Sequence, residues 1–252
     1  MTSRTVRGLS ARLQDLPPAR GRPPWPGHEY ARGWGVFALP FTSGHVLVLR
    51  VFPESSFGPY RSVWIRDPDG RWSIYVDGPL DTACPRYFGP ASDATGSARI
   101  GVTWTGPATL RVTMDSPALE WTLTATSTRI LALINVMSAV MPQVTWRLRP
   151  LVRARERLAA ALGMGQLQLT GAMPSGHTGT LMPGRMYFVD DARATLDGAD
   201  LGQPAHWPAS PVIGGFPLPA RGVLVIGQAV FAPPAGPACG ELTQSQPGRS
   251  VG

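Results

Sequence analysis

Residues Tyr60–Asp77, with the sequence YRSVWIRDPDGRWSIYVD, predict a β-hairpin and with it an antiparallel sheet. Two runs rich in β-branched and aromatic residues flank DPDG, which places Asp and Gly where a type I turn favours them. In the second run Trp72, Ile74 and Val76 alternate with more polar residues. Because successive side chains of a strand point to opposite faces, we expect one apolar and one amphipathic face.

Runs of the same kind recur along the chain and predict about ten strands. They occupy residues 45–52, 98–104, 108–114, 118–126, 166–173, 177–183, 184–191, 193–198 and 221–232. A meander of such strands leaves an apolar face and unpaired edges, so the sheet must close on itself or be covered. We therefore expect a mainly β protein built as an antiparallel, lipocalin-like or calycin-like β-barrel.

Two segments between these strands predict a helical insertion near residues 128–163. The first, STRILALINVMSAVM (127–141), begins at a Ser or Thr cap, is apolar nearly all round and stops before Pro142. We expect it to be a buried helix. The second, RPLVRARERLAAALGMG (149–165), has a proline in its first turn, apolar residues at helical spacing and glycine past its end, as an amphipathic helix does.

The expected organisation has three parts. A Pro/Arg-rich N-terminal arm (1–32) precedes the β-barrel domain (33–232), and a disordered tail (233–252) follows it. Strands come both before and after the helices, so one continuous barrel with a helical insertion and two smaller β units are both compatible with the pattern. No strict repeat decides between them.

Composition excludes several mechanisms. The 252 residues include eight Trp and 43% apolar residues, enough for a substantial core, and all 23 basic residues are arginine. Without lysine, a Schiff base, a pyridoxal-phosphate attachment and a phosphate-loop lysine are impossible. Cys84 and Cys239 are far apart, and no structural disulfide is expected. No apolar stretch has the length of a signal peptide or a membrane span, which favours a soluble, cytoplasmic protein.

The triplet SGH occurs twice, at Ser43–His45 and Ser175–His177, each time beside an apolar run. A turn and a repeated catalytic element are the two interpretations, and the Ser-Gly chemistry favours the turn. The four histidines have no partners at metal-ligand spacing, so no metal site is expected. Neither GxGxxG nor GxSxG is present, and we expect no cofactor.

Five arginines lie between residues 147 and 157, with Glu156 as the single acid among them. Such a stretch could meet nucleic acid, anionic lipid or a phosphorylated ligand, although a solvated helix face is the simpler interpretation. Aromatic residues are not interleaved with the arginines, and we expect no nucleic-acid partner. Peripheral membrane contact through this helix is compatible with the sequence. The sequence does not predict the oligomeric state.

Amphipathic strand faces and one loop supply the candidate site residues. Aromatic surface with a few polar groups is the usual lining of a small-molecule cavity. The candidates for ligand binding are Tyr60, Trp64, Tyr75, Arg86 and Arg111. A carboxyl group buried beside aromatics has a raised pKa and can donate a proton. The candidates for catalysis are Glu120, Asp190, Tyr87 and His177. The alternative for Glu120 and Asp190 is exposure to water, for the loop with Tyr87 a plug of a barrel end, and for His177 a simple turn.

The patterns GPYRSVWIRDPDGRWSIYVDG, ACPRYFG and RATLDGADLG resemble a group of uncharacterised actinobacterial proteins and, more distantly, the lipocalin-like carotenoid hydratase type of β-barrel. The likeness spans about residues 33–232 and contains no catalytic signature. It implies a barrel that handles lipophilic molecules, such as terpenoid or polyketide intermediates of secondary metabolism. We expect a cofactor-independent enzyme that cyclises, isomerises or hydrates such a molecule by acid/base chemistry, with a non-catalytic carrier as the alternative.

Overall fold

The computed structural model describes residues 4–6, 8–13 and 23–234. Cys239 and nearly all of the expected tail lie outside these residues, as do residues 14–22 of the expected arm. No helix in the described part of the chain has the length and apolarity to span a bilayer.

The strands are β1 (Arg4–Thr5), β2 (Glu29–Pro40), β3 (Val46–Ser55), β4 (Tyr60–Arg66), β5 (Trp72–Asp77), β6 (Ala94–Ser97), β7 (Ile100–Trp104), β8 (Thr109–Met114), β9 (Leu119–Ser127), β10 (Thr170–Ala172), β11 (Thr178–Leu196), β12 (Ala199–Asp200), β13 (Val212–Ile213), β14 (Phe216–Pro217) and β15 (Val223–Ala232). The helices are α1 (Leu9–Leu13), α2 (Pro85–Phe88), α3 (Arg129–Ala139) and α4 (Arg149–Ala159). Short 3₁₀ turns η1 (Leu80–Thr82), η2 (Gly89–Ala91) and η3 (Gln143–Arg147) and the π turn η4 (Ala160–Met164) complete the elements.

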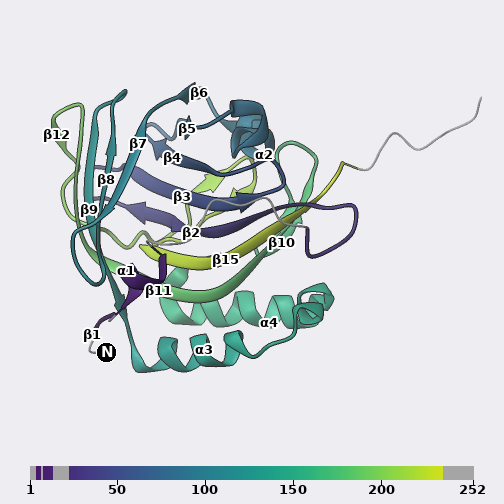
Figure 1. Cartoon of the computed structure of the whole chain (residues 1–252). Coiled ribbons are helices and arrows are strands. Elements are labelled where there is room, and N and C mark those ends of the chain that lie inside the picture. The colour runs from purple at the N-terminus through teal and green to yellow at the C-terminus, as the bar shows by residue number, and fades with distance from the viewer. Residues whose placement is uncertain (1–3, 7, 14–22, 235–252) are drawn as a thin grey trace, which may run out of the picture.

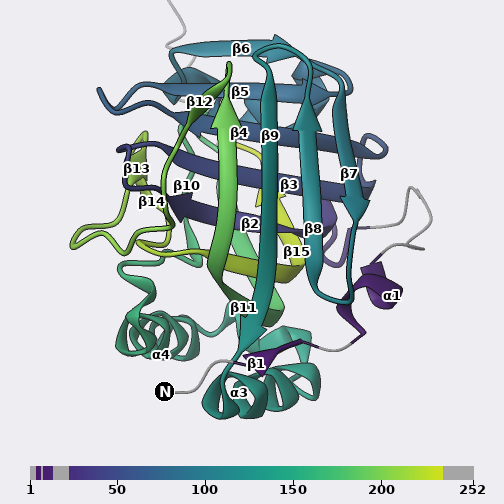
Figure 2. The ribbon, with the colours of Figure 1, turned by 90° about the vertical axis from the view of Figure 1, so that its left-hand side faces the viewer.

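Ten strands form the main path of one curled sheet, a half-barrel, in the order β6-β5-β4-β3-β2-β15-β11-β9-β8-β7 (Figures 1 and 2). The short strands β1, β10 and β12 pair with β9 or β11 beside this path. The prediction of a mainly β protein is confirmed, but the sheet is mixed because β5 and β6 pair in parallel. A parallel neighbour needs a crossover connection of about a dozen residues or more, and residues 78–93, which include α2, provide it. The expectation of a wholly antiparallel sheet was therefore wrong at this pair.

The predicted hairpin of residues 60–77 is present as β4 and β5. Arg66 lies opposite Trp72 in the register, and the backbone amide of Asp67 donates to the carbonyl of Arg71 at 3.0 Å. The Asp67 side chain accepts a hydrogen bond from the amide of Arg71 at 2.9 Å and so stabilises the turn. Burial along β5 alternates as the sequence predicts, with Trp72 and the other apolar residues inside.

Both faces of β3 and β4 are buried, in two separate clusters. On one face Leu49 and Val63 pack with Leu110 and Trp121 of the other end of the sheet, because the sheet curls over onto itself. On the other face Trp64 packs with Phe88 of α2 and with residues of β13–β15. The continuous apolar run of β3 follows from this double burial.

The helical insertion lies where the sequence predicts it, at one end of the molecule beside β11 (Figures 1 and 2). Thr128 caps α3 by accepting a hydrogen bond from the amide of Leu131 at 3.2 Å. Asn135 of α3 donates to the carbonyl of Met186 and accepts from its amide, both at 2.8 Å, and so pairs with β11 beyond the end of β9.

Helix α3 is not the buried helix that its apolar sequence predicts. Leu131 and Asn135 are its buried residues, whereas Leu133 and Val136 expose 61% and 65% of their surface. The reason is geometric: the sheet covers one side of the helix, and no described segment packs over its outer side.

Candidate ligand-binding cavity

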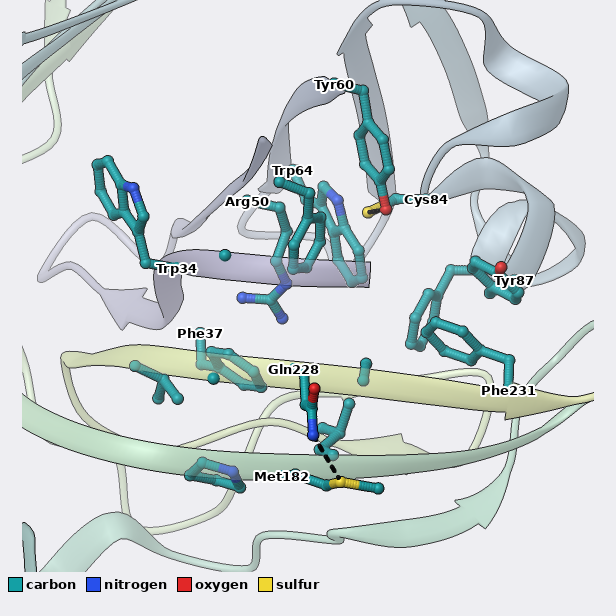
Figure 3. Close-up of a pocket in the computed structure, with 18 of the residues that line it drawn as sticks. Trp34, Phe37, Arg50, Tyr60, Trp64, Cys84, Tyr87, Met182, Gln228 and Phe231 are labelled. Atoms are coloured by element: carbon teal, nitrogen blue, oxygen red, sulfur yellow. Dashed lines mark hydrogen bonds between the residues drawn. The ribbon is translucent and has the colours of Figure 1, made fainter. Parts of the chain in front are cut away.

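A cavity of about 50 Å³ lies between β3 and β4 on one side and β11 and β15 on the other, with α2 at its end (Figure 3). Its walls are predominantly aromatic and aliphatic. They include Trp34, Phe37, Phe52, Tyr60, Trp64, Tyr87, Phe88, Leu181, Met182, Phe216, Val225 and Phe231. Arg50 projects from β3 into this space, toward Phe37 and Gln228 (Figure 3).

The register of the sheet creates room for Arg50. On one side it lies opposite Gly35 of β2, and on the other it lies opposite Ser62 of β4. A side chain at residue 35 would collide with the backbone, because a Cβ there would lie 2.0 Å from the carbonyl oxygen of Leu49. The glycine thus allows close strand contact and leaves the space beside Arg50 free of a competing side chain.

Arg50 is a buried cation, with 6% of its surface exposed. Its Nη1 donates to the carbonyl of Val36 at 3.1 Å, and its guanidinium lies 3.8 Å from the ring centre of Phe37 and 5.1 Å from that of Trp64. Burial lowers the pKa of Arg50 to about 10. The group therefore still carries its charge at neutral pH.

No carboxylate among the described residues forms an ion pair with Arg50. Its Nε and Nη2 atoms also donate no hydrogen bond within this part of the chain. A buried ion without a partner costs several kcal/mol, and the carbonyl and ring contacts offset only part of that cost. Arg50 is therefore a buried cation whose Nε and Nη2 have no described partner inside an apolar cavity.

The polar groups near Arg50 are neutral. The indole of Trp64 donates to the hydroxyl of Ser62 at 3.1 Å, and that hydroxyl donates to the Cys84 sulfur at 3.3 Å. The Tyr60 hydroxyl lies 3.7 Å from the same sulfur. Burial raises the pKa of Cys84 and of Tyr60, so both stay protonated at neutral pH. Neither side chain supplies a negative charge to Arg50.

Two larger grooves adjoin the cavity. One of about 470 Å³ shares Trp34, Phe52 and Tyr60 with the cavity wall. The other, of about 530 Å³, shares Met182 and Gln228 with it and extends to η3. The cavity alone has room for a carboxylate-sized group, whereas each groove is within the 300–1,000 Å³ that roughly suits a drug-sized ligand.

A second polar cluster lies at the α2 end of the cavity. Arg86 makes two hydrogen bonds to the carboxylate of Glu29, at 2.8 and 2.6 Å, and Tyr87 donates to the same carboxylate at 2.7 Å. Although burial alone would raise it, the pKa of Glu29 is lowered by these hydrogen bonds and by the nearby charges. Burial and the bond to Glu29 raise the pKa of Tyr87.

His177 joins this cluster, with its Nε2 4.0 Å from the Glu29 carboxylate and its ring edge-on to Tyr87. Burial lowers the pKa of His177, and Arg86 lowers it further, although Glu29 opposes the change. His177 is therefore neutral at neutral pH. The carboxylate of Glu29 is fully engaged by Arg86 and Tyr87, so the cluster is a closed ion pair with an attached histidine.

The two SGH triplets form the same turn. In each, the glycine amide donates to a residue three positions earlier, Phe41 or Met173, and that residue's amide donates to the carbonyl of the histidine. Both glycines have positive φ, 87° and 83°. In both, the Ser hydroxyl hydrogen-bonds the histidine Nδ1, at 3.0 and 2.9 Å. The turn interpretation is confirmed.

The predicted site residues separate into three places. Tyr60, Trp64 and Tyr87 line the cavity, and Arg86 and His177 lie beside it around Glu29. Tyr75 packs against the cluster on the opposite face of the sheet, because the register places Val63 opposite it and Ile74 opposite Trp64. The ring of Tyr75 therefore does not reach the cavity.

The predicted acids lie away from the cavity. Glu120 and Arg111 form a surface ion pair at 3.1 Å, with 68% and 49% of their side chains exposed. Asp190 pairs with Arg221 and lies 3.6 Å from His206, at the bulge where the β9–β11 register shifts. His177 and Asp190 thus have different partners and do not form one site.

Sequence reasoning missed Arg50, although a signal was available. Arg50 interrupts the apolar run VLVLRVF, and a charge at the centre of a strand buried on both faces is unusual. Glu29 was also missed. The expected alternation could not reveal that Glu29 meets Arg86, which lies 57 residues away in the chain.

No group of three His, Cys, Asp or Glu side chains in the described part of the chain is placed to hold a metal ion. The described cysteine, Cys84, is buried and free. No protein-family model matches the chain, and no curated protein or solved structure is significantly similar to it.

Proposed function

We propose that the protein binds an organic anion with a largely apolar body, its carboxylate on Arg50. The observation that carries this proposal is the buried guanidinium without a carboxylate partner. An incoming carboxylate would supply the missing charge and accept from the unused nitrogens of Arg50. Charge-assisted hydrogen bonds of this kind are about twice as strong as neutral ones.

The apolar body of the ligand would extend from the cavity into an adjoining groove. Trp34 and Phe52 form a shared wall toward one groove, and Met182 toward the other. Terpenoid and polyketide acids have this combination of one acid and a large apolar surface. In this proposal the half-barrel serves as a lipocalin-like container.

The carrier interpretation is the better supported of the two expected functions. Glu120 and Asp190 do not line the cavity, and Tyr87 is committed to Glu29. A group whose pKa is raised is a weak acid, so Tyr60 and Cys84 are poorly suited to protonate a hydrocarbon.

Acid/base isomerisation of the bound molecule is the second candidate. It is favoured by one observation: Tyr60 and Cys84 place two neutral proton donors in contact on the wall that also holds Arg50. Recovery of the ligand after incubation, followed by mass spectrometry, distinguishes the two candidates. An unchanged ligand supports the carrier, and a changed one supports the enzyme.

Calorimetry with dodecanoate, oleate and retinoate, each against its methyl ester, tests the proposal. We expect at least one acid to bind, its ester to bind much more weakly, and Arg50→Met to reduce affinity for the acid roughly 100-fold. Arg111→Met removes an arginine from an exposed ion pair and is the matched control. Equal affinity for acid and ester, or unchanged binding by Arg50→Met, would contradict the proposal.

A further inference from the structure

The exposed apolar surface of the described chain is concentrated in the helical insertion. Eleven large hydrophobic side chains are exposed in the described residues, and ten of them lie between Ile130 and Leu158. Soluble proteins rarely expose a contiguous apolar patch of this kind unless it meets a partner. We call the residues of α3, η3 and α4 that form it the helical face.

On α3 the exposed side chains follow a helical stripe. Ile130, Leu133, Met137 and Val140 are spaced by three or four residues, so they lie along one side of the helix. Leu131 and Asn135 hold the other side against β11. Helix α3 therefore presents an apolar stripe outward, which is the opposite of a soluble surface helix.

On α4 leucines and arginines are both exposed, and their spacing places the two kinds of side chain on different sides of the helix. Leu151 and Leu158 are exposed, as are Arg149, Arg153 and Arg157. The single acid of the insertion, Glu156, is half-buried and accepts from the amide of Leu169 at 2.7 Å. The helical face is thus apolar and positive, and no exposed carboxylate from the insertion balances its charge.

A groove of about 440 Å³ runs beside α3 and adds three further positive groups. Arg12, Arg129 and Arg185 line it together with the hydroxyls of Ser127 and Thr128. None of the three arginines forms an ion pair with a described residue. Their arrangement suits an anionic group such as a lipid phosphate.

From these observations we infer that the helical face docks on the surface of an anionic phospholipid bilayer. Interfacial helices bind such surfaces by inserting apolar side chains while arginines contact the headgroups. Each arginine near the surface adds electrostatic attraction to anionic lipid. No described helix spans a bilayer, so the contact is peripheral.

A second copy of the chain fits the helical face less well. A two-fold interface would bring the same patch of each copy together and would oppose their arginines. Like charges across an interface are unfavourable, and the insertion offers no exposed acid to pair with them. An anionic bilayer satisfies both the apolar and the positive part of the face.

The position of the helical face also relates to the cavity. Ser138, Met141 and Trp146 of the insertion line the groove that shares Met182 and Gln228 with the cavity wall. If the proposed ligand function holds, a docked bilayer would lie close to the entrance used by a lipophilic acid. Docking itself does not depend on that function.

Flotation of the full chain with vesicles tests the inference. Vesicles of phosphatidylcholine with phosphatidylglycerol are expected to retain the protein, and vesicles of phosphatidylcholine alone to retain far less. Leu133→Glu with Val136→Glu should abolish retention, since both side chains are exposed and the substitutions leave the core intact. Val212→Glu, at an exposed apolar residue outside the insertion, is the control and should not change it.

A charge variant separates electrostatic from apolar binding and does not introduce acids. Arg129→Gln with Arg185→Gln is expected to weaken retention about 25-fold, roughly fivefold for each arginine. Arg111→Gln with Arg193→Gln makes the same charge change on the exposed side of the sheet and should have little effect. Equal retention on both vesicle types, or no loss with either double variant, would overturn the inference.

Sedimentation without lipid tests the alternative that a second copy of the chain binds the helical face. A dimer that becomes monomeric in Leu133→Glu, together with no retention on vesicles, would assign the face to a second copy and overturn the inference. Arg50→Met, which alters only the buried cavity, should leave vesicle retention unchanged. Failure of ligand binding and failure of membrane docking are therefore distinguishable.

Discussion

Arg50 and Arg86 both lie at the same cavity, but only Arg86 has a carboxylate partner. Arg86 holds Glu29 through two hydrogen bonds, whereas Arg50 contacts two backbone carbonyls and two aromatic rings. A paired arginine is satisfied within the fold, and an unpaired buried one stores an unfavourable energy that an external anion can relieve. The contrast separates an arginine that is paired within the fold from the one to which we assign the ligand in the proposed function.

The difference between the two arginines is tested most strongly by giving Arg50 a carboxylate partner within the protein. Ser62 lies directly opposite Arg50 in the β3–β4 register, so Ser62→Asp would place a carboxylate beside the guanidinium. We expect affinity for the tightest-binding acid to fall roughly 100-fold, because the new carboxylate occupies the anion site. Calorimetry measures the change. Ser62→Asn has nearly the same shape without charge, and an equal loss with it would show that shape and not charge is responsible.

Removing the paired arginine should destabilise the fold. Arg86→Met leaves the Glu29 carboxylate with Tyr87 and His177 but without its cation. Since the pair is partly exposed, with 34% and 23% of the side chains accessible, we expect a loss of about 2 kcal/mol in the free energy of unfolding. Urea denaturation measures it. Arg111→Met, from an exposed pair, should change stability by only about 0.5 kcal/mol, and equal losses would show that burial does not distinguish the pairs.

Removing the unpaired arginine should have the opposite sign. Arg50→Met replaces a buried, uncompensated charge with an apolar side chain of similar length. We expect the free energy of unfolding to rise by about 1 kcal/mol in the absence of ligand. The same denaturation series that measures Arg86→Met checks this value. Destabilisation by Arg50→Met would mean that its contacts with Val36 and Phe37 outweigh the cost of burying the charge.

Acidification should produce the smallest effect and involves the two SGH turns. Burial lowers the pKa of His45 and of His177 below the ordinary value of 6.5. As the pH falls below 6.5, the unfolded chain therefore takes up protons before the folded protein does, and stability decreases. Urea unfolding above and below pH 6.5 measures this decrease. In His45→Gln with His177→Gln the decrease should be smaller, and an unchanged pH dependence would exclude these histidines as its source.

Much of the local structure could be predicted because it depends on neighbours in the sequence. The Asp67–Arg71 turn, the alternating burial of β5 and the Thr128 cap all involve residues within a few positions of one another. The amphipathic faces were also visible as periodicities. Their partners were not, which is why Tyr60 and Trp64 reach the cavity while Tyr75 packs on the opposite face.

The parts that could not be predicted depend on contacts between distant segments. The parallel β5–β6 pair depends on how residues 78–93 cross the sheet. Helix α3 is exposed because no described segment packs over its outer side. The apolar sequence of α3 indicates burial, but it does not specify how many sides of the helix other segments will cover. The sequence pattern of Arg111 and Glu120 was also compatible with a place in the cavity. The curvature of the sheet puts this ion pair on the outer surface instead.

By itself the sequence determined a mainly β chain with a helical insertion and two identical SGH turns. It also determined that arginine supplies all the positive side-chain charge at neutral pH. Turns, caps and alternation arise from short-range sterics and hydrogen bonds, which the order of residues specifies directly. Only the tertiary structure decided that Arg50 is unpaired while Arg86 is paired. Whether a buried charge finds a partner depends on which distant strand faces it, and that is set by register and curvature of the whole sheet.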